Sequence, residues 1–309
     1  MGALEFEPAM RDRDRSESAA PLEMGRLVED AKRALRGAFP DIAQDIIEIG
    51  SSAGGTRAKA VIGWNAATGE IVSGQFELPP GIQHWLLKFD GMGDDGELGT
   101  SDGFGRIEYA HYLMAREAGI AMSECRLLEE GGRAHFMTRR FDRERKDKLH
   151  VQTLCAMRHL DFNLPYVHGY EELFRTILEL RLGVDAIEEA WRRCVFNVLC
   201  RNCDDHTKNT AFLMRPSGAW ELAPAYDLCF AHNPAWGHWT RQHQMLVAGK
   251  AQGILREDLV ELGTKFGVRR ASAKYDRLRD AVRRWPEFAR EAGVAEDAVA
   301  AVARSQELG

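Results

Sequence analysis

The chain contains 309 residues, of which 45% are hydrophobic, and its formal charge is −6. This length is sufficient for two lobes. The acidic balance excludes a dedicated nucleic-acid-binding protein, because neutralising phosphates requires a concentrated basic surface. No apolar run approaches the roughly 20 residues that span a membrane, and the N-terminus lacks the apolar core of a signal peptide. We therefore expect a cytoplasmic protein with no membrane partner.

The first predicted elements surround a glycine-containing loop. Residues 1–25 are polar and charge-alternating and predict a flexible segment, whereas apolar spacing predicts a helix at 27–39. A β-rich run at 45–49, the loop GSSAGGTRAK at 50–59 and a strand at 60–64 follow. Such a hairpin can place its tip over phosphates. The loop lacks the Walker A and G-x-G-x-x-G patterns, so an ordinary hairpin turn is the alternative.

A lysine interrupts the next apolar strand. Residues 83–90 read QHWLLKFD, in which Lys88 is the charged exception. A charge within an apolar strand is rarely left unpaired. Glu108, on a helix predicted at 106–118 and closed by Gly119, is a candidate ion-pair partner. The alternative is an edge-strand lysine that prevents aggregation.

The remaining pattern divides the chain into a β-rich and a helical part. Residues 91–105 are rich in Gly and Asp and predict a mobile loop, and strands are expected at 125–128 and 134–138. Amphipathic helices are predicted at 171–182 and 186–199, and two or three more from Glu257 onward. We expect a bilobal α+β architecture, with an N-lobe at residues 26–140 and a helical C-lobe at 141–309.

Residues 202–209 read NCDDHTKN, and a strand, a turn and a second strand then lead to PAYDL. Asp204 precedes Asn209 by five residues, and Asp227 follows Asn209 by eighteen. This spacing is typical of a protein-kinase-type catalytic loop, in which a base Asp precedes a metal-binding Asn and a second metal-binding Asp follows. The alternative is an Asx-rich turn after a helix. Asp205, outside this spacing, is expected to be a structural or solvated neighbour.

The six cysteines do not indicate a disulfide framework in a chain of this length. Cys200 and Cys203 form a C-x-x-C with His206 three residues later. A zinc site needs a further ligand and a thioredoxin-like site needs a βαβ context, and the sequence offers neither. We expect scattered buried thiols.

These regions together resemble the HipA family of bacterial toxin–antitoxin serine/threonine kinases. The motifs that carry the resemblance, between residue 46 and about residue 250, are GSSAGGTRAK, WLLKFD, IEYAHYLMAREAGI, TRRFDR, HVQTLC, NCDDHTKN, PAYDL and HQMLVAGK. DDHTKN and PAYDL are the most specific. The resemblance implies a bilobal protein-kinase-like fold with ATP and Mg²⁺ as cofactors. The family prototype phosphorylates an aminoacyl-tRNA synthetase and halts translation.

Residue roles also follow from the resemblance. It implies that Asp204 is the catalytic base, that Asn209 and Asp227 bind Mg²⁺, and that Lys88 contacts ATP phosphates. The implied phosphate loop contains Ala53, Gly54, Gly55, Thr56 and Lys59. The implied hinge beside adenine is Arg139, Arg140 and Phe141, and His206, Lys208 and Tyr226 are implied to complete the nucleotide pocket. Members of the family autophosphorylate a serine ahead of the loop, for which Ser51 and the adjacent Ser52 are the candidates.

The chain departs from the family pattern at its start. The phosphate loop is one residue longer than in the prototype, and Arg139 stands where the prototype has an acidic residue. The opening MGALEFEPA resembles the end of the small N-terminal subdomain of full-length members. We therefore expect a short-form kinase with two protein partners. One is a helix-turn-helix antitoxin of the HipB type, through which any DNA contact is indirect, and the other is a small antitoxin that resembles the absent subdomain.

The sequence favours an ATP-dependent serine/threonine protein kinase that acts as a toxin on a protein substrate. Two alternatives stay open. One is a kinase of the same fold that phosphorylates a small molecule. The other is a catalytically silent co-repressor subunit, whose expected mark is the loss of an Asp, Asn or Lys from the constellation, and none of these residues is lost.

Overall fold

The computed structural model describes residues 2–4, 22–28, 58–74, 77–91, 94–95, 99–100, 103–144, 147–233 and 239–307. The chain forms two compact units. Unit 1 comprises Met1–Arg106 and Ser123–Lys148, and unit 2 comprises Ile107–Met122 and Leu149–Gly309. The sequence-based division placed residues 26–140 in one lobe, whereas the contacts group Ile107–Met122 with unit 2.

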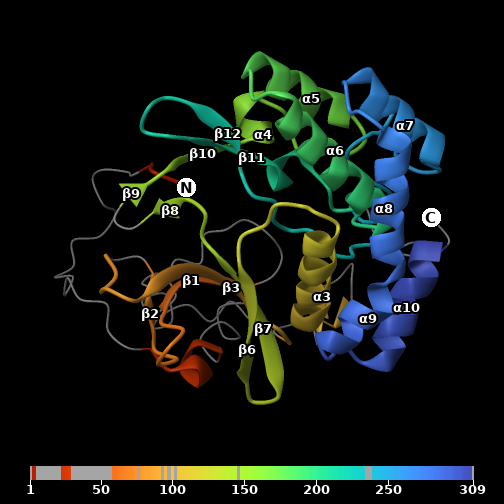
Figure 1. Ribbon diagram of the computed structural model, residues 1–309. Coiled ribbons are helices and arrows are strands. Elements are labelled where there is room, and N and C mark those ends of the chain that lie inside the picture. Colours follow the sequence, from red (N-terminus) through yellow and green to blue (C-terminus); the bar gives the residue numbers. More distant parts are fainter. Residues whose placement is uncertain are drawn as a thin grey trace. The chain divides into compact units, whose positions relative to one another are not determined.

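Unit 1 is built on a five-stranded antiparallel sheet with the order β2-β1-β3-β7-β6 (Figure 1). The strands are β1 (Lys59–Trp64), β2 (Ile71–Ser73), β3 (Gln83–Lys88), β6 (Cys125–Glu130) and β7 (Arg133–Arg139). Buried apolar side chains from alternating positions, among them Ile62, Trp85 and Leu87, form its core. The predicted strands at 60–64, 83–90, 125–128 and 134–138 are confirmed.

Short strand pairs lie within the segments that connect these elements. The predicted loop at 91–105 contains the pair β4 (Asp94–Asp95) and β5 (Gly99–Thr100). A second pair joins β8 (Arg143–Glu144) to β9 (Asp147–Lys148). Residues 24–28 are helical. The rest of the helix predicted at 27–39, the strand at 45–49 and the loop up to residue 57 lie outside the described residues.

Helix α3 (Phe104–Glu117) confirms the helix predicted at 106–118. It ends as predicted at Gly119, whose φ is +76°. The Gly119 N–H donates to the Arg116 carbonyl (3.0 Å), and the Ile120 N–H donates to the Ala115 carbonyl (2.9 Å). Glycine adopts this left-handed conformation without steric cost, so the helix stops cleanly there. Residues 120–123 then begin the connection to β6.

Unit 2 combines a small sheet with a set of helices. Its sheet has the order β10-β11-β12, formed by β10 (His150–Thr153), β11 (Ala211–Met214) and β12 (Trp220–Leu222). Helices α4 (Leu154–Met157), α5 (Tyr170–Glu179) and α6 (Val184–Leu199) follow β10. The predicted helices at 171–182 and 186–199 and the strand pair after Asn209 are thus confirmed.

The C-terminal part holds α7 (Arg256–Lys265), α8 (Ala271–Arg283), α9 (Trp285–Glu291) and α10 (Glu296–Glu307). The sequence predicted two or three helices there, and the structure has four. Pro286, at the start of α9, explains the extra division, because proline favours the first turn of a helix and disrupts its interior. Gly293, with φ of +73°, separates α9 from α10.

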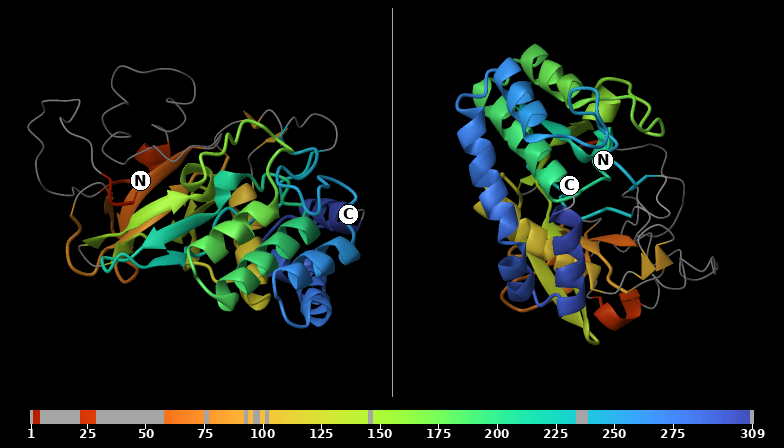
Figure 2. Two further views of the ribbon diagram at one scale, coloured as in Figure 1. Left: turned by 90° about the horizontal axis from the view of Figure 1, so that it is seen from above. Right: turned by 90° about the vertical axis from the view of Figure 1, so that its right-hand side faces the viewer.

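Two apolar clusters hold the helices of unit 2 together. In the first, Trp191 on α6 packs with residues of α5, α7 and α8, and its indole N–H donates to the Leu259 carbonyl (2.8 Å). In the second, residues of α3 pack with Phe196 of α6 and with α9 and α10. Figure 2 shows the helices of both clusters from two further sides. Helix α6 therefore contributes to both clusters. No helix in the described part of the chain is long and apolar enough to cross a membrane.

Candidate active site

The segment NCDDHTKN lies between α6 and β11 in unit 2. Arg201 adopts φ of +55°, which turns the chain out of the helix. Asn202 forms a parallel bridge with Ala231, and the Cys203 N–H donates to the Ala231 carbonyl (3.0 Å). The 3-10 helix η1 (Thr207–Asn209) then leads into β11. The loop is therefore tied at one end to the segment that follows PAYDL.

Asp204 presents a half-exposed side chain at the centre of this loop, with 47% of its area accessible. Its Oδ1 accepts a hydrogen bond from Gln244 Nε2 (3.0 Å) and lies 3.7 Å from His206 Nε2. Its backbone carbonyl accepts a hydrogen bond from Asn209 Nδ2 (2.8 Å). The carboxylate is thus held on one side and open to solvent on another. A proton acceptor needs this combination.

Asp205 has the opposite environment and is buried. Its Oδ2 accepts hydrogen bonds from the Tyr170 hydroxyl (2.9 Å) and from His243 Nδ1 (3.1 Å). Its Oδ1 accepts from the backbone N–H groups of Gln244 (2.8 Å) and Met245 (3.3 Å). A carboxylate with four donors is a structural anchor. Of the two roles expected for Asp205, a structural or a solvated neighbour, the structural role is therefore the one observed.

A chain of buried hydrogen bonds runs from Asp205 to the PAYDL segment. Tyr170 donates to Asp205, Asn197 Nδ2 donates to the Tyr170 hydroxyl (2.9 Å), and Asn202 Nδ2 donates to Asn197 Oδ1 (2.9 Å). Asn202 Nδ2 also donates to the backbone carbonyl of Asp227 (3.0 Å). Burial and the charge of Asp205 raise the pKa of Tyr170 well above its usual range, so its hydroxyl remains a donor. Asp205 and the backbone of Asp227 are thus linked through side chains.

Asp227 adopts a left-handed backbone conformation, with φ of +54°. Such conformations are costly for residues other than glycine and cluster at functional sites. The preceding residue, Tyr226, donates its hydroxyl proton to the Lys208 carbonyl (2.6 Å). Burial and the charge of Asp227 raise the pKa of Tyr226, which keeps this donor protonated. The NCDDHTKN loop and the Asp227 segment are therefore joined by side-chain hydrogen bonds at two points, through Asn202 and through Tyr226.

Side chains of the loop also gather around Phe162. Lys208 Nζ lies 3.3 Å from the centre of the Phe162 ring, and the His206 ring meets that ring edge-on at 6.1 Å. Nδ1 of His206 is buried and has no hydrogen-bond partner among the described residues, and the same is true of Thr207 Oγ1. Buried polar atoms of this kind normally have a partner. Their position beside Asp204 is consistent with a polar ligand or water.

The donor set suits Mg²⁺ better than zinc. The described residues contain no cluster of three or more His, Cys, Asp or Glu that would hold a metal ion. Mg²⁺ commonly uses one or two protein oxygens together with phosphates and water. Asn209, whose amide nitrogen is engaged by the Asp204 carbonyl, and Asp227 offer side-chain oxygens of that kind. The residues present therefore fit the ion that the sequence implies.

The C-x-x-C pair takes no part in this arrangement. Cys200 and Cys203 are both buried. Burial raises the pKa of Cys203 to about 12 and that of Cys200 well above its usual range. Thiols in this state are poor nucleophiles and poor metal ligands. The expectation of scattered buried thiols holds for both residues.

Two candidate lysines lie side by side on the sheet of unit 1. Lys59 on β1 and Lys88 on β3 are directly opposite each other in the strand register, so their side chains leave the same face. Lys88 Nζ lies 5.6 Å from the centre of the Phe136 ring. The register therefore places two positively charged side chains next to each other. The other residues of the predicted loop, Ser51, Ser52, Ala53, Gly54, Gly55 and Thr56, lie outside the described residues.

The predicted hinge residues begin at Arg139, the last residue of β7. The Arg139 N–H donates to the Glu124 carbonyl (2.8 Å), and the Arg140 N–H donates to the His84 carbonyl (2.9 Å). The Arg140 guanidinium forms a bidentate pair with Asp142 (2.8 and 2.5 Å). Burial alone would raise the pKa of Asp142, but hydrogen bonds and charges from Arg140 and Arg143 hold it below its usual range. The side chain of Arg140 thus has a structural task, and contact of Phe141 with adenine stays a prediction.

Glu108 lies on α3 and is buried, with 4% of its area accessible. It belongs to unit 2, whereas Lys88 belongs to unit 1. Their ion pair stays a prediction.

Comparison with known proteins identifies the family of the chain. The family model described as the HipA-like C-terminal domain matches residues 51–305. The chain belongs to the HipA-like family. The resemblance found in the sequence is thereby confirmed. No curated protein matches the chain in sequence.

Solved structures show the fold that accompanies this family. The HipA chain of the Shewanella oneidensis MR-1 complex of HipA, HipB and operator DNA matches with a TM-score of 0.69 and 19% identity, over 99% of this chain and 73% of that one. The Helicobacter pylori proinflammatory kinase CtkA matches more weakly, with a TM-score of 0.44 and 10% identity, over 78% of this chain and 92% of that one. The predicted α+β kinase-like fold is confirmed.

The HipA-like loop has supporting residues that sequence reasoning did not identify. Gln244 holds Asp204, and Tyr170, Asn197 and Asn202 connect Asp205 to Asp227. Gln244 belongs to the motif HQMLVAGK, which was recognised only as part of a resemblance. Its separation of forty residues from Asp204 leaves no local pattern that would reveal the contact.

Proposed function

We propose that this chain is an ATP-dependent serine/threonine protein kinase that acts as the toxin of a bacterial toxin–antitoxin module. The observation that supports it most is the contrast within the catalytic loop. Asp204 is half-exposed and oriented by Gln244, while Asp205 anchors the loop through hydrogen bonds to its carboxylate. Family membership is consistent with the same function.

Each residue has a distinct task in the proposed reaction. Asp204 accepts the proton of the acceptor hydroxyl, and Gln244 holds its carboxylate in place. Asn209 and Asp227 would bind Mg²⁺, which when bound neutralises charge on the transferred phosphate. Lys59 and Lys88 place two positive charges on one sheet face for the ATP phosphates. Arg139, Arg140 and Phe141 are proposed to border adenine, and His206, Lys208 and Tyr226 to line the nucleotide pocket.

The proposed protein partner is a helix-turn-helix antitoxin of the HipB type. The Shewanella protein was solved with HipB and operator DNA, and DNA contact of the present chain is proposed to be indirect in the same way. A small antitoxin that resembles the N-terminal subdomain is a second proposed partner. The proposed acceptor is a translation component such as an aminoacyl-tRNA synthetase, and Ser51 or Ser52 is the proposed site of autophosphorylation.

The decisive experiment is incubation of the purified chain with γ-labelled ATP, Mg²⁺ and a bacterial lysate. A labelled protein band, absent when Asp204→Asn replaces the native chain, is the expected result. Label that appears only in small molecules would instead favour a small-molecule kinase. Mass spectrometry of the native chain then locates any phosphate on Ser51 or Ser52, and Ser51→Ala and Ser52→Ala identify which serine carries it.

A further inference from the structure

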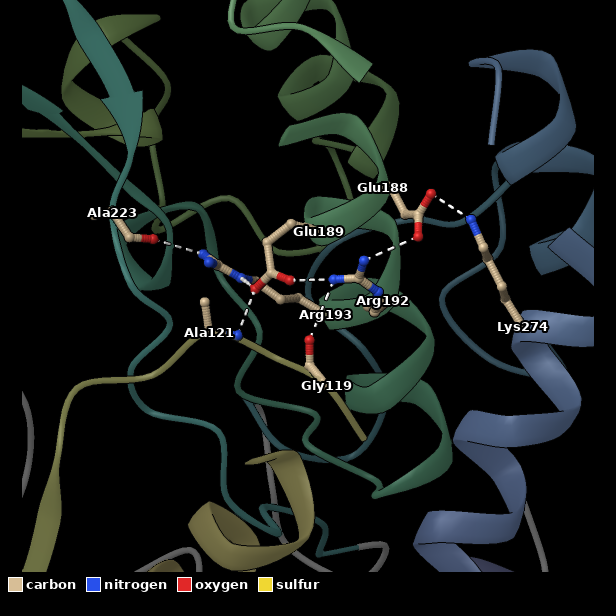
Figure 3. Close-up of polar contacts among 8 residues, drawn as sticks. All are labelled: Gly119, Ala121, Glu188, Glu189, Arg192, Arg193, Ala223 and Lys274. Carbon is tan, nitrogen blue, oxygen red and sulfur yellow. Dashed lines mark hydrogen bonds and ion pairs between the residues drawn. The ribbon is translucent and has the colours of Figure 1, made fainter. Parts of the chain in front are cut away.

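Helix α6 carries a cluster of ion pairs that no part of the proposed reaction uses (Figure 3). Two of its residues, Glu189 and Arg193, are largely buried, with side-chain accessibilities of 13% and 7%. Arg193 Nε donates to Glu189 Oε1 (2.9 Å). A buried guanidinium without such a partner is strongly unfavourable, so the two residues depend on each other.

This pair contacts the backbone of two segments that are far apart in the sequence. Arg193 Nη1 donates to the Ala223 carbonyl (2.9 Å), and Glu189 Oε1 accepts a hydrogen bond from the Ala121 N–H (3.0 Å). The two segments also contact each other, because the Ala225 N–H donates to the Ala121 carbonyl (2.8 Å) and Met122 forms a parallel bridge with Ala225. Figure 3 shows both backbone groups pointing at the ion pair.

Each segment continues into a predicted site residue. Ala121 lies four residues after the end of α3, the helix that carries Glu108. Ala223 precedes Asp227 by four residues. The ion pair therefore stands where the α3 segment and the Asp227 segment meet.

We propose that Glu189 and Arg193 are positioning residues, which fix the Asp227 segment and the end of α3 to helix α6. The inference rests on the proposed kinase function, because Asp227 is there a ligand of Mg²⁺. Neither side chain is required to touch substrate or metal. Their effect is to restrict the backbone that carries Asp227, as residues behind a metal ligand commonly do.

The same helix supplies a matched control. Glu188 pairs with Arg192 (2.9 Å) and, through its other oxygen, with Lys274 on α8. Lys274 thus joins α6 to α8 by a partly buried ion pair, and among the described residues none of its contacts is to the segments of Ala121 or Ala223. Loss of the Lys274 contact tests general damage to α6 and leaves the bonds of Glu189 and Arg193 to those two segments in place, because Arg192, which pairs with both Glu188 and Glu189, is retained.

The first measurement is the Mg²⁺ concentration that gives half-maximal phosphate transfer. Glu189→Gln keeps the shape of the side chain but removes the charge that Arg193 needs, and we expect the requirement for Mg²⁺ to rise about tenfold. Lys274→Met should change it less than about twofold, because its ion pair is only partly buried and contacts neither segment. Arg193→Lys, which retains the charge but not the two-partner geometry, should lie between them. An equal rise in Glu189→Gln and Lys274→Met would overturn the proposal.

The second measurement does not depend on kinase activity. In Glu189→Gln without nucleotide, hydrogen exchange should accelerate at the amides of Ala121 and Ala225, while Lys274→Met should leave both unchanged. If the native chain transfers no phosphate, the proposed function fails and this exchange still tests the positioning role. Unchanged exchange at both amides in Glu189→Gln and in Arg193→Lys would overturn it, even if the chain proves to be an active kinase. If Glu189→Gln does not fold, Arg193→Lys decides both measurements.

Discussion

In the catalytic loop, Asp204 and Asp205 are held by side chains that come from distant parts of unit 2, whereas Lys59 and Lys88 in unit 1 are aligned by the register of two strands. The loop therefore depends on individual polar partners, each of which is vulnerable to substitution. The alignment of the lysine pair depends on the backbone pairing of two strands. Substitutions near the loop should consequently be more damaging than substitutions near the lysines.

The largest expected effect is on Asp204 itself. Asp204→Asn keeps the hydrogen bond from Gln244 possible but removes the proton acceptor, so the rate of phosphate transfer should fall about 10³-fold. Binding of Mg²⁺-ATP, measured by calorimetry, should be retained. The exposed Asp280→Asn serves as control and should leave the rate unchanged. Native-like transfer by Asp204→Asn would show that Asp204 is not the proton acceptor.

Asp205 tests how strongly the loop depends on its buried partners. Asp205→Asn places an amide NH₂ group opposite two of the four hydrogen-bond donors, because each carboxylate oxygen accepts from two of them, and this should lower the free energy of unfolding by about 3 kcal/mol. Urea denaturation measures this loss. Tyr170→Phe, which removes one of those donors, should cost about 1 kcal/mol. A fully stable Asp205→Asn would show that the network is not what holds the loop.

Lys88 tests the other side of the comparison. Lys88→Met should reduce kcat/KM for ATP about 10²-fold, because a positive charge aimed at phosphate is lost. Its unfolding free energy should stay close to that of the native chain, because the strand register remains. Lys148→Met, at an exposed position of the same unit, is the control. An unchanged kcat/KM in Lys88→Met would place the phosphates elsewhere.

The smallest expected effect is a dependence of stability on acid. Burial lowers the pKa of His111 to about 4, and its Nδ1 is bonded to the Ile107 carbonyl (2.8 Å). The folded state therefore keeps His111 neutral while the unfolded state binds a proton below pH of about 6.5. Stability is complete above that pH and is lost as the pH falls from about 6.5 to 4. Between pH 7.5 and pH 5 the loss due to His111 should be about 2 kcal/mol.

Urea unfolding at the two pH values measures this loss. In His111→Gln the loss of unfolding free energy between the two pH values should shrink by the contribution of His111. His168→Gln, at a partly exposed position, should show the same loss as the native chain. His84 in unit 1 also has a pKa lowered to about 4, by burial and then by Arg143 and Arg140. Some acid sensitivity should therefore persist in His111→Gln. An unaltered pH dependence would show that His111 is protonated in the folded state.

Local patterns predicted the elements of the fold, and spacing predicted the loop. Alternation in QHWLLK and apolar periodicity in 186–199 correspond to β3 and α6, because one face of each is buried. The C-terminal helices were undercounted because the boundary at Pro286 falls inside a continuous apolar pattern. The pair β8–β9 was not predicted, since two-residue strands leave no periodic signal.

The partners of the site were harder to predict than its central residues. Asp204, Asn209 and Asp227 were selected by their spacing, but Gln244 and Tyr170 reach the loop only through the tertiary fold. Asn197 appeared as one position of an amphipathic helix, and its place between Tyr170 and Asn202 depends on the packing of α5 against α6. Contacts across such distances are determined by topology and not by neighbouring residues.

The left-handed backbone at Asp227 restricts which amino acids the position accepts. Aspartate and asparagine adopt this conformation more readily than other side chains with a Cβ atom, whereas glutamate gains nothing from it. Glutamate is an equally good oxygen ligand in chemical terms, yet Asp227→Glu would combine backbone strain with a displaced carboxylate. The backbone conformation and the proposed role as an Mg²⁺ ligand therefore make two independent demands on this position, and aspartate meets both with a full negative charge.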